Sequence, residues 1–257
     1  MTTVRYDFTS YAPTYEHRAD YAPQVVDAML RVVAARAGDP VCDIGAGSGH
    51  LTIPLLEHGL RVDAVEPNAA MREVGERRTA RFDAVSWFNG QGERSGRPAD
   101  EYAVVTFGSS FDRTDQPLAL REAARILRPG GYFVCGWNHR VLDDPLQREV
   151  EALIHDRIPD YRYGLRRTDP TGVIRDSGLF EDVVHLSGQV VHEIDTDSWC
   201  AAWRSHMTLG SQAGDRFDEI VTEIERLVTA RAGARVRVPY VTPIWLARLG
   251  EGTGHER

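Results

Sequence analysis

The sequence contains no lysine, and all 30 of its Lys and Arg positions are arginine. That absence excludes a lysine nucleophile, a lysine Schiff base and the lysine of a Walker-type phosphate loop. Cysteine is scarce, since Cys42, Cys135 and Cys200 lie far apart and none belongs to a C-x-x-C pair. We therefore expect neither a disulfide framework nor a zinc cluster. Cys42 and Cys135 fall inside strand-like runs, which predicts buried thiols in a reducing compartment.

Two further absences concern location and partners. The N-terminal stretch "MTTVRYDFTSYAPTYEHR" has no apolar targeting region, and no run in the chain reaches membrane-spanning length. We therefore expect a cytoplasmic protein without a membrane partner. A net charge of −8 argues against a nucleic-acid partner, which normally requires a basic face. At 257 residues the chain is long enough for one large domain or a domain with a lid.

The chain does have a regular alternation of strand-like and helix-like segments. Short, apolar, β-branched runs predict strands, and apolar positions at helical spacing predict the helices between them. This alternation is typical of βαβ units in a parallel sheet, for which right-handed crossovers make the doubly wound fold the default. The predicted strands cover 39–45, 61–67, 84–89, 102–108 and 131–137, and the predicted helices 23–37, 50–59, 69–81 and 116–127.

The second half of the chain is less regular. Its predicted elements are helices over 143–158, 195–209 and 215–232, and strands over 182–194 and 235–249. Gly188 should interrupt the first of these strands. Pro239 and Pro243 should confine the last strand to a sheet edge or a bulge, because proline has no N–H for a sheet ladder.

The most informative motif is "VCDIGAGSGHL" at residues 41–51, where the first predicted strand ends. Gly45, Gly47 and Gly49 read G-x-G-x-G, whereas the dinucleotide fingerprint reads G-x-G-x-x-G and binds a pyrophosphate. Asp43, just before the first glycine, has the wrong charge to face a pyrophosphate. Backbone N–H groups at a helix start favour a carboxylate, and Asp43 can accept from an ammonium. We therefore interpret the loop as a site for the amino-acid group of an adenosyl ligand.

A second carboxylate, Glu66, ends the second predicted strand, 17 residues after Gly49. An acid at this position can accept hydrogen bonds from both ribose hydroxyls of an adenosyl group, as it does in NAD enzymes. Glu66 alone does not distinguish the two cofactors. Its combination with D-x-G-x-G-x-G indicates an adenosyl ligand without a pyrophosphate.

Three motifs, "VCDIGAGSGHLT", "VDAVEPNAAM" and "ILRPGGYFV", resemble those of class I S-adenosylmethionine-dependent methyltransferases of the small-molecule type. Within this type, the motifs are similar to those of the ubiquinone-methyltransferase and trans-aconitate-methyltransferase relatives. The resemblance covers residues 39–137 and implies S-adenosylmethionine as cofactor, with S-adenosylhomocysteine as product. It implies a doubly wound, Rossmann-like α/β fold, whose mostly parallel seven-stranded sheet has an antiparallel edge strand and an inserted helical cap.

The resemblance also implies the organisation of this single domain. We expect a helical cover over 1–38, a cofactor-binding core over 39–137, a helical substrate cap over 138–180 and 195–234, and the last strand over 235–249.

Adenine recognition is expected in "NGQGERSG", residues 89–96. There Gly92 would offer its N–H to the adenine ring, and the carbonyl of Gln91 can accept from the exocyclic amine. Glu93 is either a further contact or a helix-start acid. The predicted cofactor set is Tyr15, Arg18, Asp43, Gly45, Ala46, Gly47, Gly49, Glu66, Pro67, Met71, Gln91, Gly92, Glu93, Phe107 and Gly108.

The segment "YAPTYEHRADY", residues 11–21, resembles one that folds over the cofactor in the family. Tyr11, Tyr15 and Arg18 are its candidates, with Arg18 facing the methionine carboxylate. The alternative is an amphipathic cap that packs its rings on the core.

The acceptor is expected beyond the fourth and fifth strands. Ser109, Ser110 and Phe111 follow the fourth strand, and Trp137 and His139 follow the fifth. His139 is the predicted general base, because the ordinary pKa of histidine suits proton transfer near neutral pH. An exposed loop histidine without a catalytic role is the alternative.

Two more segments bear on the acceptor. Trp199, Trp203 and His206 share one face of the predicted helix and either roof the acceptor pocket or belong to the core. The stretch "YRYGLRR", residues 161–167, could bind an acceptor carboxylate or phosphate, but we expect a solvated surface loop.

The leading interpretation is methyl transfer to an O or N atom of a small molecule, plausibly in secondary metabolism. Positioning should dominate the in-line displacement, because the leaving thioether needs no proton. The alternatives are C-methylation of an activated carbon and a binding module without chemistry. Methylation of RNA or protein and nicotinamide chemistry fit the charge and the glycine spacing less well. Homodimer formation is left open, and no metal is expected.

Overall fold

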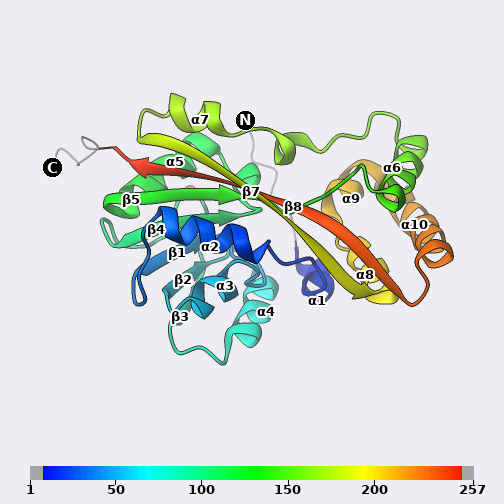
Figure 1. Ribbon diagram of the computed structural model, residues 1–257, viewed down its shortest axis with the longest axis horizontal. Coiled ribbons are helices and arrows are strands. Elements are labelled where there is room, and N and C mark those ends of the chain that lie inside the picture. Colours follow the sequence, from blue (N-terminus) through cyan, green and yellow to red (C-terminus); the bar gives the residue numbers. More distant parts are fainter. Residues whose placement is uncertain (1–7, 251–257) are drawn as a thin grey trace.

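Eight strands form a single sheet at the centre of the molecule (Figure 1). The structure is a computed structural model that describes residues 8–250. Its order is β3-β2-β1-β4-β5-β8-β6, and β7 pairs with β8 outside this path. The strands are β1 (Pro40–Ile44), β2 (Arg61–Val65), β3 (Val85–Phe88), β4 (Tyr102–Gly108), β5 (Leu127–Gly136), β6 (His139–Arg140), β7 (Phe180–Asp195) and β8 (Arg235–Leu249). The Rossmann-like, mostly parallel fold is confirmed, and the short β6 adds one strand to the predicted seven.

Helices cover both faces of the parallel part of the sheet. Val26 and Met29 of α2 pack with Val41 of β1 on one face, and Leu120 of α5 packs with Phe133 of β5 on the other. Burial on both faces explains why β1 and β4 read as continuous apolar runs. The core helices are α1 (Ala12–Tyr15), α2 (Pro23–Val32), α3 (Thr52–Glu57), α4 (Ala69–Thr79), α5 (Gln116–Ile126) and α7 (Thr171–Asp176), with 3-10 turns η1 (Thr9–Tyr11), η2 (Phe111–Arg113) and η3 (Gly164–Arg167).

The position predicted for the last strand is wrong, because β8 lies inside the sheet. β8 is antiparallel to β5 on one side and to β7 on the other. The carbonyl of Pro243 accepts from Trp137 N at 3.1 Å, and that of Pro239 accepts from Val141 N at 2.9 Å. Since N–H and C=O of one residue point the same way in an antiparallel strand, both proline nitrogens face the β5–β6 side. The ladder is interrupted opposite Pro243, between Gly136 and His139, and β6 ends at Arg140, before the position opposite Pro239, so neither missing N–H breaks a continuous ladder.

The interruption predicted at Gly188 is also wrong, because β7 is continuous from Phe180 to Asp195. A Cβ atom at Gly188 would lie 2.4 Å from Cγ2 of Val25 in α2. The glycine therefore permits close approach of a helix rather than a break in the strand.

The β7–β8 ribbon extends past the parallel core, and four helices gather around its far half (Figure 1). Ile154, Trp199, Ile224 and Val238 belong to the hydrophobic cluster of this cap. The helices are α6 (Pro145–Arg157), α8 (Thr196–Trp203), α9 (Met207–Ala213) and α10 (Phe217–Ala232), with the 3-10 turn η4 (Gly214–Arg216). The predicted helix over 195–209 is thus two helices, and His206 caps the second by accepting from Leu209 N at 3.2 Å.

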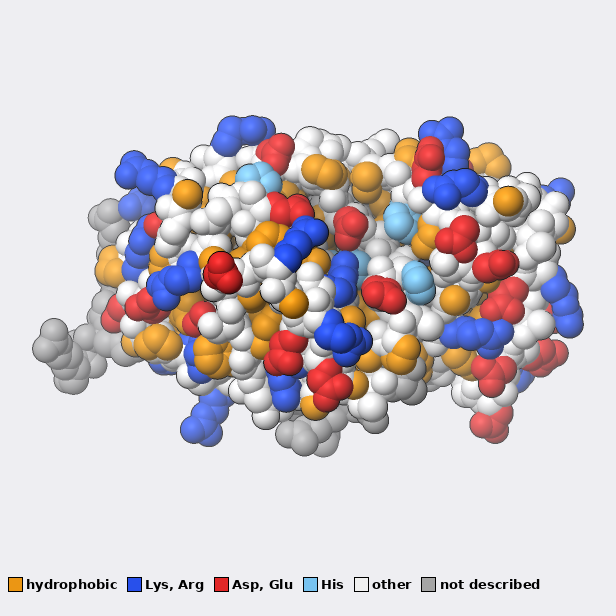
Figure 2. Space-filling view, turned by 90° about the horizontal axis from the view of Figure 1, so that it is seen from below, with side chains coloured by type: hydrophobic (Ala, Val, Ile, Leu, Met, Phe, Trp, Pro, Cys, Tyr) orange, Lys and Arg blue, Asp and Glu red, His pale blue; other side chains and the backbone are white. Residues whose placement is uncertain are grey.

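Side chains of both charges are interspersed over the face shown in Figure 2. Among residues 8–250, no helix has the length and apolar character needed to cross a membrane. Cys42, Cys135 and Cys200 are free and buried, which confirms the burial predicted for the first two.

Candidate functional site

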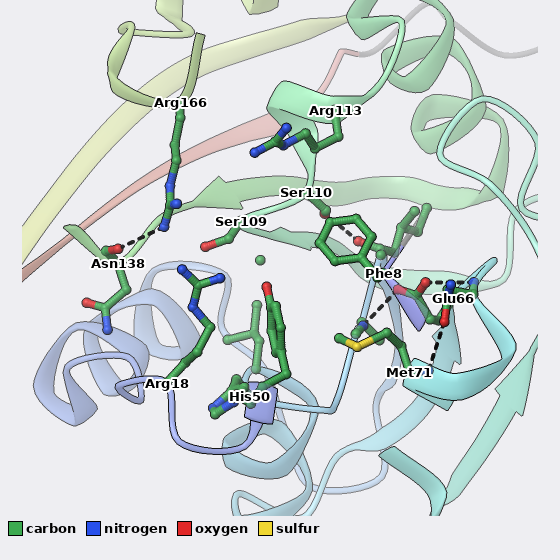
Figure 3. A pocket seen from close by; sticks show the side chains of 18 of the residues that line it. Phe8, Arg18, His50, Glu66, Met71, Ser109, Ser110, Arg113, Asn138 and Arg166 are labelled. Atoms are coloured by element: carbon green, nitrogen blue, oxygen red, sulfur yellow. Dashed lines mark hydrogen bonds between the residues drawn. The ribbon is translucent and has the colours of Figure 1, made fainter. Parts of the chain in front are cut away.

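A cavity of about 1260 Å³ lies where the carboxyl ends of β1, β2 and β4 meet the N-terminal segment and the cap (Figure 3). Its volume exceeds the roughly 300–1,000 Å³ that a pocket for one drug-sized ligand occupies, so it has room for a cofactor and an acceptor. Most of the predicted residues line it: Tyr15, Arg18, Asp43, Gly45, Ala46, Gly47, Glu66, Pro67, Met71, Gln91, Gly92, Glu93, Gly108, Ser109, Ser110, His139, Trp199, Trp203 and His206.

The glycine loop after β1 forms one wall. Gly45 and Gly47 have φ of +67° and +58°, in the left-handed region that favours glycine. A Cβ atom at Gly45 would also lie 2.4 Å from Cβ of Ser110, on the loop after β4. These two loops therefore approach closely only because a glycine stands here.

Glu66 at the end of β2 is fixed by two backbone donors. Its Oε2 accepts from Gly47 N at 2.9 Å and its Oε1 from Asn68 N at 2.8 Å. Burial raises the pKa of Glu66 above its ordinary value, while these two hydrogen bonds oppose the shift. Each carboxylate oxygen has two lone pairs, so both can still accept from a ligand in the cavity.

Asp43 lies deeper, at the end of β1. It is 1% exposed, and its two oxygens accept from the hydroxyls of Thr52 at 2.6 Å and Thr106 at 2.7 Å. Burial raises the pKa of Asp43 to about 6, against the opposing effect of both hydroxyls. The carboxylate is thus ready to attract a cation, because its surroundings supply none within ion-pair distance in the described part of the chain.

The stretch after β3, where adenine recognition is expected, forms another wall of the cavity. Gln91, Gly92 and Glu93 all line the cavity, and Oε1 of Glu93 accepts from Asp115 N at 2.7 Å. Glu93 is therefore fixed next to Asp115, the N-cap residue of α5, and in the described part of the chain no helix starts at Glu93 itself. Its contact with a ligand stays a prediction.

Five candidate residues do not line the cavity, which corrects their predicted placement; one of them is Tyr11, whose hydroxyl lies near Gly210 of α9. Phe107 and Phe111 are fully buried in the core and pack with Phe133, with ring centroids 5.6 and 5.2 Å away. Trp137 is also in this core and donates from Nε1 to Asp112 at 2.8 Å. Gly49 sits behind the loop, beside Thr52 and Thr79. Of these three rings only that of Phe107 belongs to a strand, β4, where it points into the core, whereas Phe111 lies in η2 and Trp137 directly follows β5.

Tyr21 is a cavity residue that the sequence reasoning missed. Its hydroxyl lies 2.9 Å from Oγ of Ser109, at the β4 edge where an acceptor is expected. Burial raises the pKa of Tyr21 well above its ordinary value. Tyr21 is therefore a neutral hydrogen-bonding group near neutral pH.

His139 lines the cavity and is 8% exposed, so it is not an exposed loop histidine. Burial lowers its pKa to about 3, and the positive charges of Arg166 and Arg167 add to the effect. A histidine with this pKa is neutral near pH 7 but only weakly basic. The predicted role as general base stays untested, and the electrostatics of the free protein oppose it.

An aromatic wall closes the cap side. The rings of Trp199 and Trp203 have centroids 5.6 Å apart, and His206 stacks on Trp203 at 4.8 Å. Trp199 and Trp203 also belong to the hydrophobic cluster of the cap, so they both line the cavity and support the cap. Burial, followed by the charges of Arg140 and Arg18, holds the pKa of His206 well below its ordinary value.

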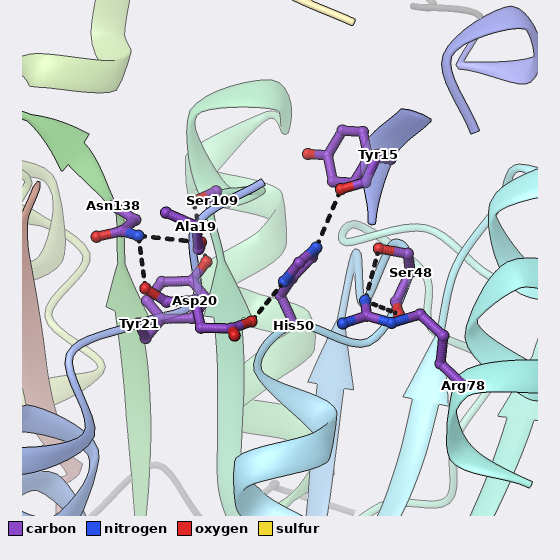
Figure 4. A network of polar contacts seen from close by, with 9 residues as sticks. All are labelled: Tyr15, Ala19, Asp20, Tyr21, Ser48, His50, Arg78, Ser109 and Asn138. Carbon is purple, nitrogen blue, oxygen red and sulfur yellow. Dashed lines mark hydrogen bonds and ion pairs between the residues drawn. The ribbon is translucent and has the colours of Figure 1, made fainter. Parts of the chain in front are cut away.

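The N-terminal segment lies over the cavity as a strap, which we define as residues 15–22 (Figure 4). His50 lies 2.9 Å from Oδ1 of Asp20 and 3.1 Å from the carbonyl of Tyr15. Asn138 Nδ2 donates to the carbonyls of Ala19 at 3.0 Å and Asp20 at 2.8 Å. These contacts bring Tyr15 and Arg18 to the cavity, as predicted for a segment that folds over a ligand.

The expectation of a solvated loop over 161–167 is wrong in part, because Tyr163, Arg166 and Arg167 line the cavity. The loop follows α6 of the cap, and only the tertiary fold turns it inwards. The concentration of arginine and tyrosine in this stretch is the signal for the alternative interpretation, binding of an acceptor carboxylate or phosphate, which stays a prediction.

The profile of a family described as a methyltransferase domain matches residues 15–160, more than half of the chain. The chain belongs to this family. An uncharacterized methyltransferase of Mycobacterium tuberculosis is 37% identical over 147 residues, which cover 54% of this chain and 57% of that protein. A ubiquinone/menaquinone biosynthesis C-methyltransferase of Rubrivivax gelatinosus is 34% identical over 110 residues, 42% of each chain. The chain thus matches little more than half the length of the first of these relatives, and less of the second.

Solved structures show the same fold. The YcgJ protein of Bacillus subtilis aligns with a TM-score of 0.56 at 20% identity, covering 90% of this chain and 100% of that one. A Haemonchus contortus phosphoethanolamine N-methyltransferase, in complex with S-adenosyl-L-methionine, aligns with a TM-score of 0.55 at 16% identity, covering 95% and 57%. The resemblance predicted from the three motifs is therefore confirmed at the level of family and fold.

Proposed function

We propose that the protein transfers a methyl group from S-adenosylmethionine to an O or N atom of a small molecule. The observation that carries the proposal is the pairing of the glycine loop with Glu66, whose carboxylate is held by Gly47 N at 2.9 Å on the cavity wall. In this arrangement Glu66 accepts the ribose hydroxyls, and Gly92 and Gln91 meet the adenine. Asp43 attracts the ammonium and Arg18 receives the methionine carboxylate.

The methyl group would then face the β4 edge, where Ser109 and Ser110 line the cavity. Transfer breaks the bond between the methyl carbon and the sulfonium and forms a bond to the acceptor atom. The sulfur keeps the electron pair as a neutral thioether, and any proton on the acceptor leaves to solvent. Positioning in a cavity closed by the strap supplies the acceleration.

The titratable groups near Ser109 support an acceptor that is already nucleophilic. His139 has a lowered pKa of about 3 and is a weak base, and the raised pKa of Tyr21 makes its phenolate scarce. A carboxylate, a phenolate or an amine needs no protein base, whereas a carbon acceptor generally does. C-methylation therefore remains the second candidate, restricted to a carbon activated by its own chemistry.

A binding module without chemistry would be expected to block the β4 edge. Instead, Ser109 and Ser110 open into the same cavity as Glu66, which favours catalysis. A crystal structure with S-adenosylhomocysteine tests the proposal. We expect the adenine between Gln91 and Gly92 and the ribose on Glu66, and a ligand bound elsewhere would overturn it.

A further inference from the structure

The two halves of the cavity carry opposite charge. Its acidic side chains lie at or after the carboxyl ends of β1, β2 and β3, or at the start of α5, and are Asp43, Glu66, Glu93 and Asp115. Its five arginines are Arg18, Arg113, Arg140, Arg166 and Arg167, on the strap, the cap side and the loop after β4. This concentration is unexpected in a chain of net charge −8.

Two of these arginines are neutralised by the protein itself. Arg140 pairs with Glu151 at 2.7 Å, and Arg113 pairs with Asp112 at 3.2 Å. Asp112 also accepts from Nε1 of Trp137, so each of its two oxygens has a partner. Neither arginine needs a ligand to balance its charge.

Arg166 is different. Its guanidinium points into the cavity beside Arg18 and Ser109 (Figure 3). The hydrogen bond of this head group is a long one of 3.4 Å to the carbonyl of Asn138, and its Nε is buried without a hydrogen-bond partner. Within residues 8–250, no carboxylate lies at ion-pair distance from Arg166 or Arg18. Burial, and then the charge of Arg18, lowers the pKa of Arg166.

Arg18 and Arg166 lie beside one another in the cavity, and the methionine part of the cofactor brings a single carboxylate to them. The methionine carboxylate accounts for Arg18, and the half-buried side chain of Arg166, whose Nε–H is buried and unpaired, still faces the acceptor space. We propose that the acceptor carries an oxyanion group, a carboxylate or a phosphate, and that Arg166 binds it as a specificity-determining residue. This inference rests on the proposed function, since it places the anion on the acceptor.

The walls beside Arg166 indicate the body of such an acceptor. Trp199, Trp203 and Tyr163 line this half of the cavity, and the planes of Trp203 and His206 are stacked at 18°. Flat apolar surfaces favour a planar ring or an unsaturated chain. The planar fork of arginine suits two oxygens of one carboxylate or phosphate. A planar molecule that carries a carboxylate or a phosphate fits both the aromatic walls and the guanidinium of Arg166.

The test uses three probes of similar shape: benzoate, phenyl phosphate and the neutral benzamide. Binding of each is measured by calorimetry at fixed ionic strength, in protein saturated with S-adenosylhomocysteine and in the ligand-free protein. We expect at least one anion to bind about tenfold or more tightly than benzamide, as for a gained charged hydrogen bond. A stronger signal from benzoate assigns a carboxylate, and one from phenyl phosphate assigns a phosphate.

Arg166→Gln should abolish the preference for the anion and leave the affinity for S-adenosylhomocysteine unchanged. Arg166→Lys should keep part of the preference for the anion, because lysine keeps the positive charge but lacks the planar guanidinium that binds two oxygens at once. Arg162→Gln is the matched control, since Arg162 lies in the same loop, is exposed and does not line the cavity. Equal binding of benzamide and both anions, or an unchanged preference in a folded Arg166→Gln variant, would overturn the inference. Failure of S-adenosylhomocysteine to bind would instead contradict the proposed function, because the anion preference is also measured without it.

Discussion

The carboxylate of Glu66 and the backbone N–H of Gly47 are joined by a hydrogen bond of 2.9 Å. This bond ties the end of β2 to the glycine loop after β1, so that the acid proposed to bind the ribose and the loop proposed to receive the amino-acid group form one surface. The two residues are 19 positions apart in the chain and meet because β1 and β2 are parallel neighbours.

Replacement of Glu66 by glutamine should weaken the binding of S-adenosylhomocysteine about tenfold to a hundredfold, because a charged acceptor becomes a neutral one. Calorimetry measures this loss. Glu73→Gln is the control, since Glu73 is exposed on α4 and does not line the cavity. Unchanged affinity in a folded Glu66→Gln variant would remove Glu66 from the ribose site.

Asp43→Asn should stabilise the ligand-free protein at about pH 8 by about 1–3 kcal/mol, since it removes a buried charge. Burial raises the pKa of Asp43 from 3.8 to about 6, so the charged carboxylate costs stability above that range. As the pH falls through about 6, wild-type Asp43 takes up a proton and the advantage of the variant fades. Urea unfolding at several pH values measures both effects. A variant that is no more stable at pH 8 contradicts this account of Asp43.

His139 should stay neutral in the free protein from about pH 8 down to about pH 5. Burial and the charges of Arg166 and Arg167 lower its pKa to about 3. The histidine ring resonances of the protein, assigned by comparison with His139→Gln, follow this directly. A midpoint near the ordinary value of 6.5 would restore His139 as a candidate base.

His50→Ala should loosen the strap, because His50 contacts both the side chain of Asp20 and the backbone of Tyr15. We expect faster tryptic cleavage after Arg18 and a several-fold weaker affinity for S-adenosylhomocysteine. His58→Ala is the matched control, since His58 likewise joins a carboxylate, Asp27 at 2.9 Å, to a backbone carbonyl but does not line the cavity. Equal cleavage rates in the two variants would show that the contact of His50 does not hold the strap.

The cofactor half of the cavity could be predicted from the sequence because its residues are local to strand ends. Gly45, Gly47 and Glu66 follow directly from a parallel sheet, whose carboxyl ends share one edge. The predicted placement was wrong where it depended on which face of the sheet a side chain points to. Phe107 is the next-to-last residue of β4. Its ring packs into the core, whereas Gly108 and Ser109, which follow it, line the cavity.

The acceptor half could not be predicted, because it depends on long-range packing. The cap surrounds the far half of the β7–β8 ribbon, and this arrangement turns the loop of Arg166 towards the strap. Ala19 and Asn138 are 119 positions apart and meet at the strap only through the closed fold. Neither a motif nor a periodicity marks such contacts.

The most direct test of the account is a calorimetric comparison of S-adenosylhomocysteine and NAD on the unmodified protein. The glycine loop, Asp43 and Glu66 predict saturable binding of S-adenosylhomocysteine at one site per chain and no measurable heat with NAD. Binding of NAD, or the absence of binding by S-adenosylhomocysteine, would contradict the central claim that this cavity holds an adenosyl methyl donor.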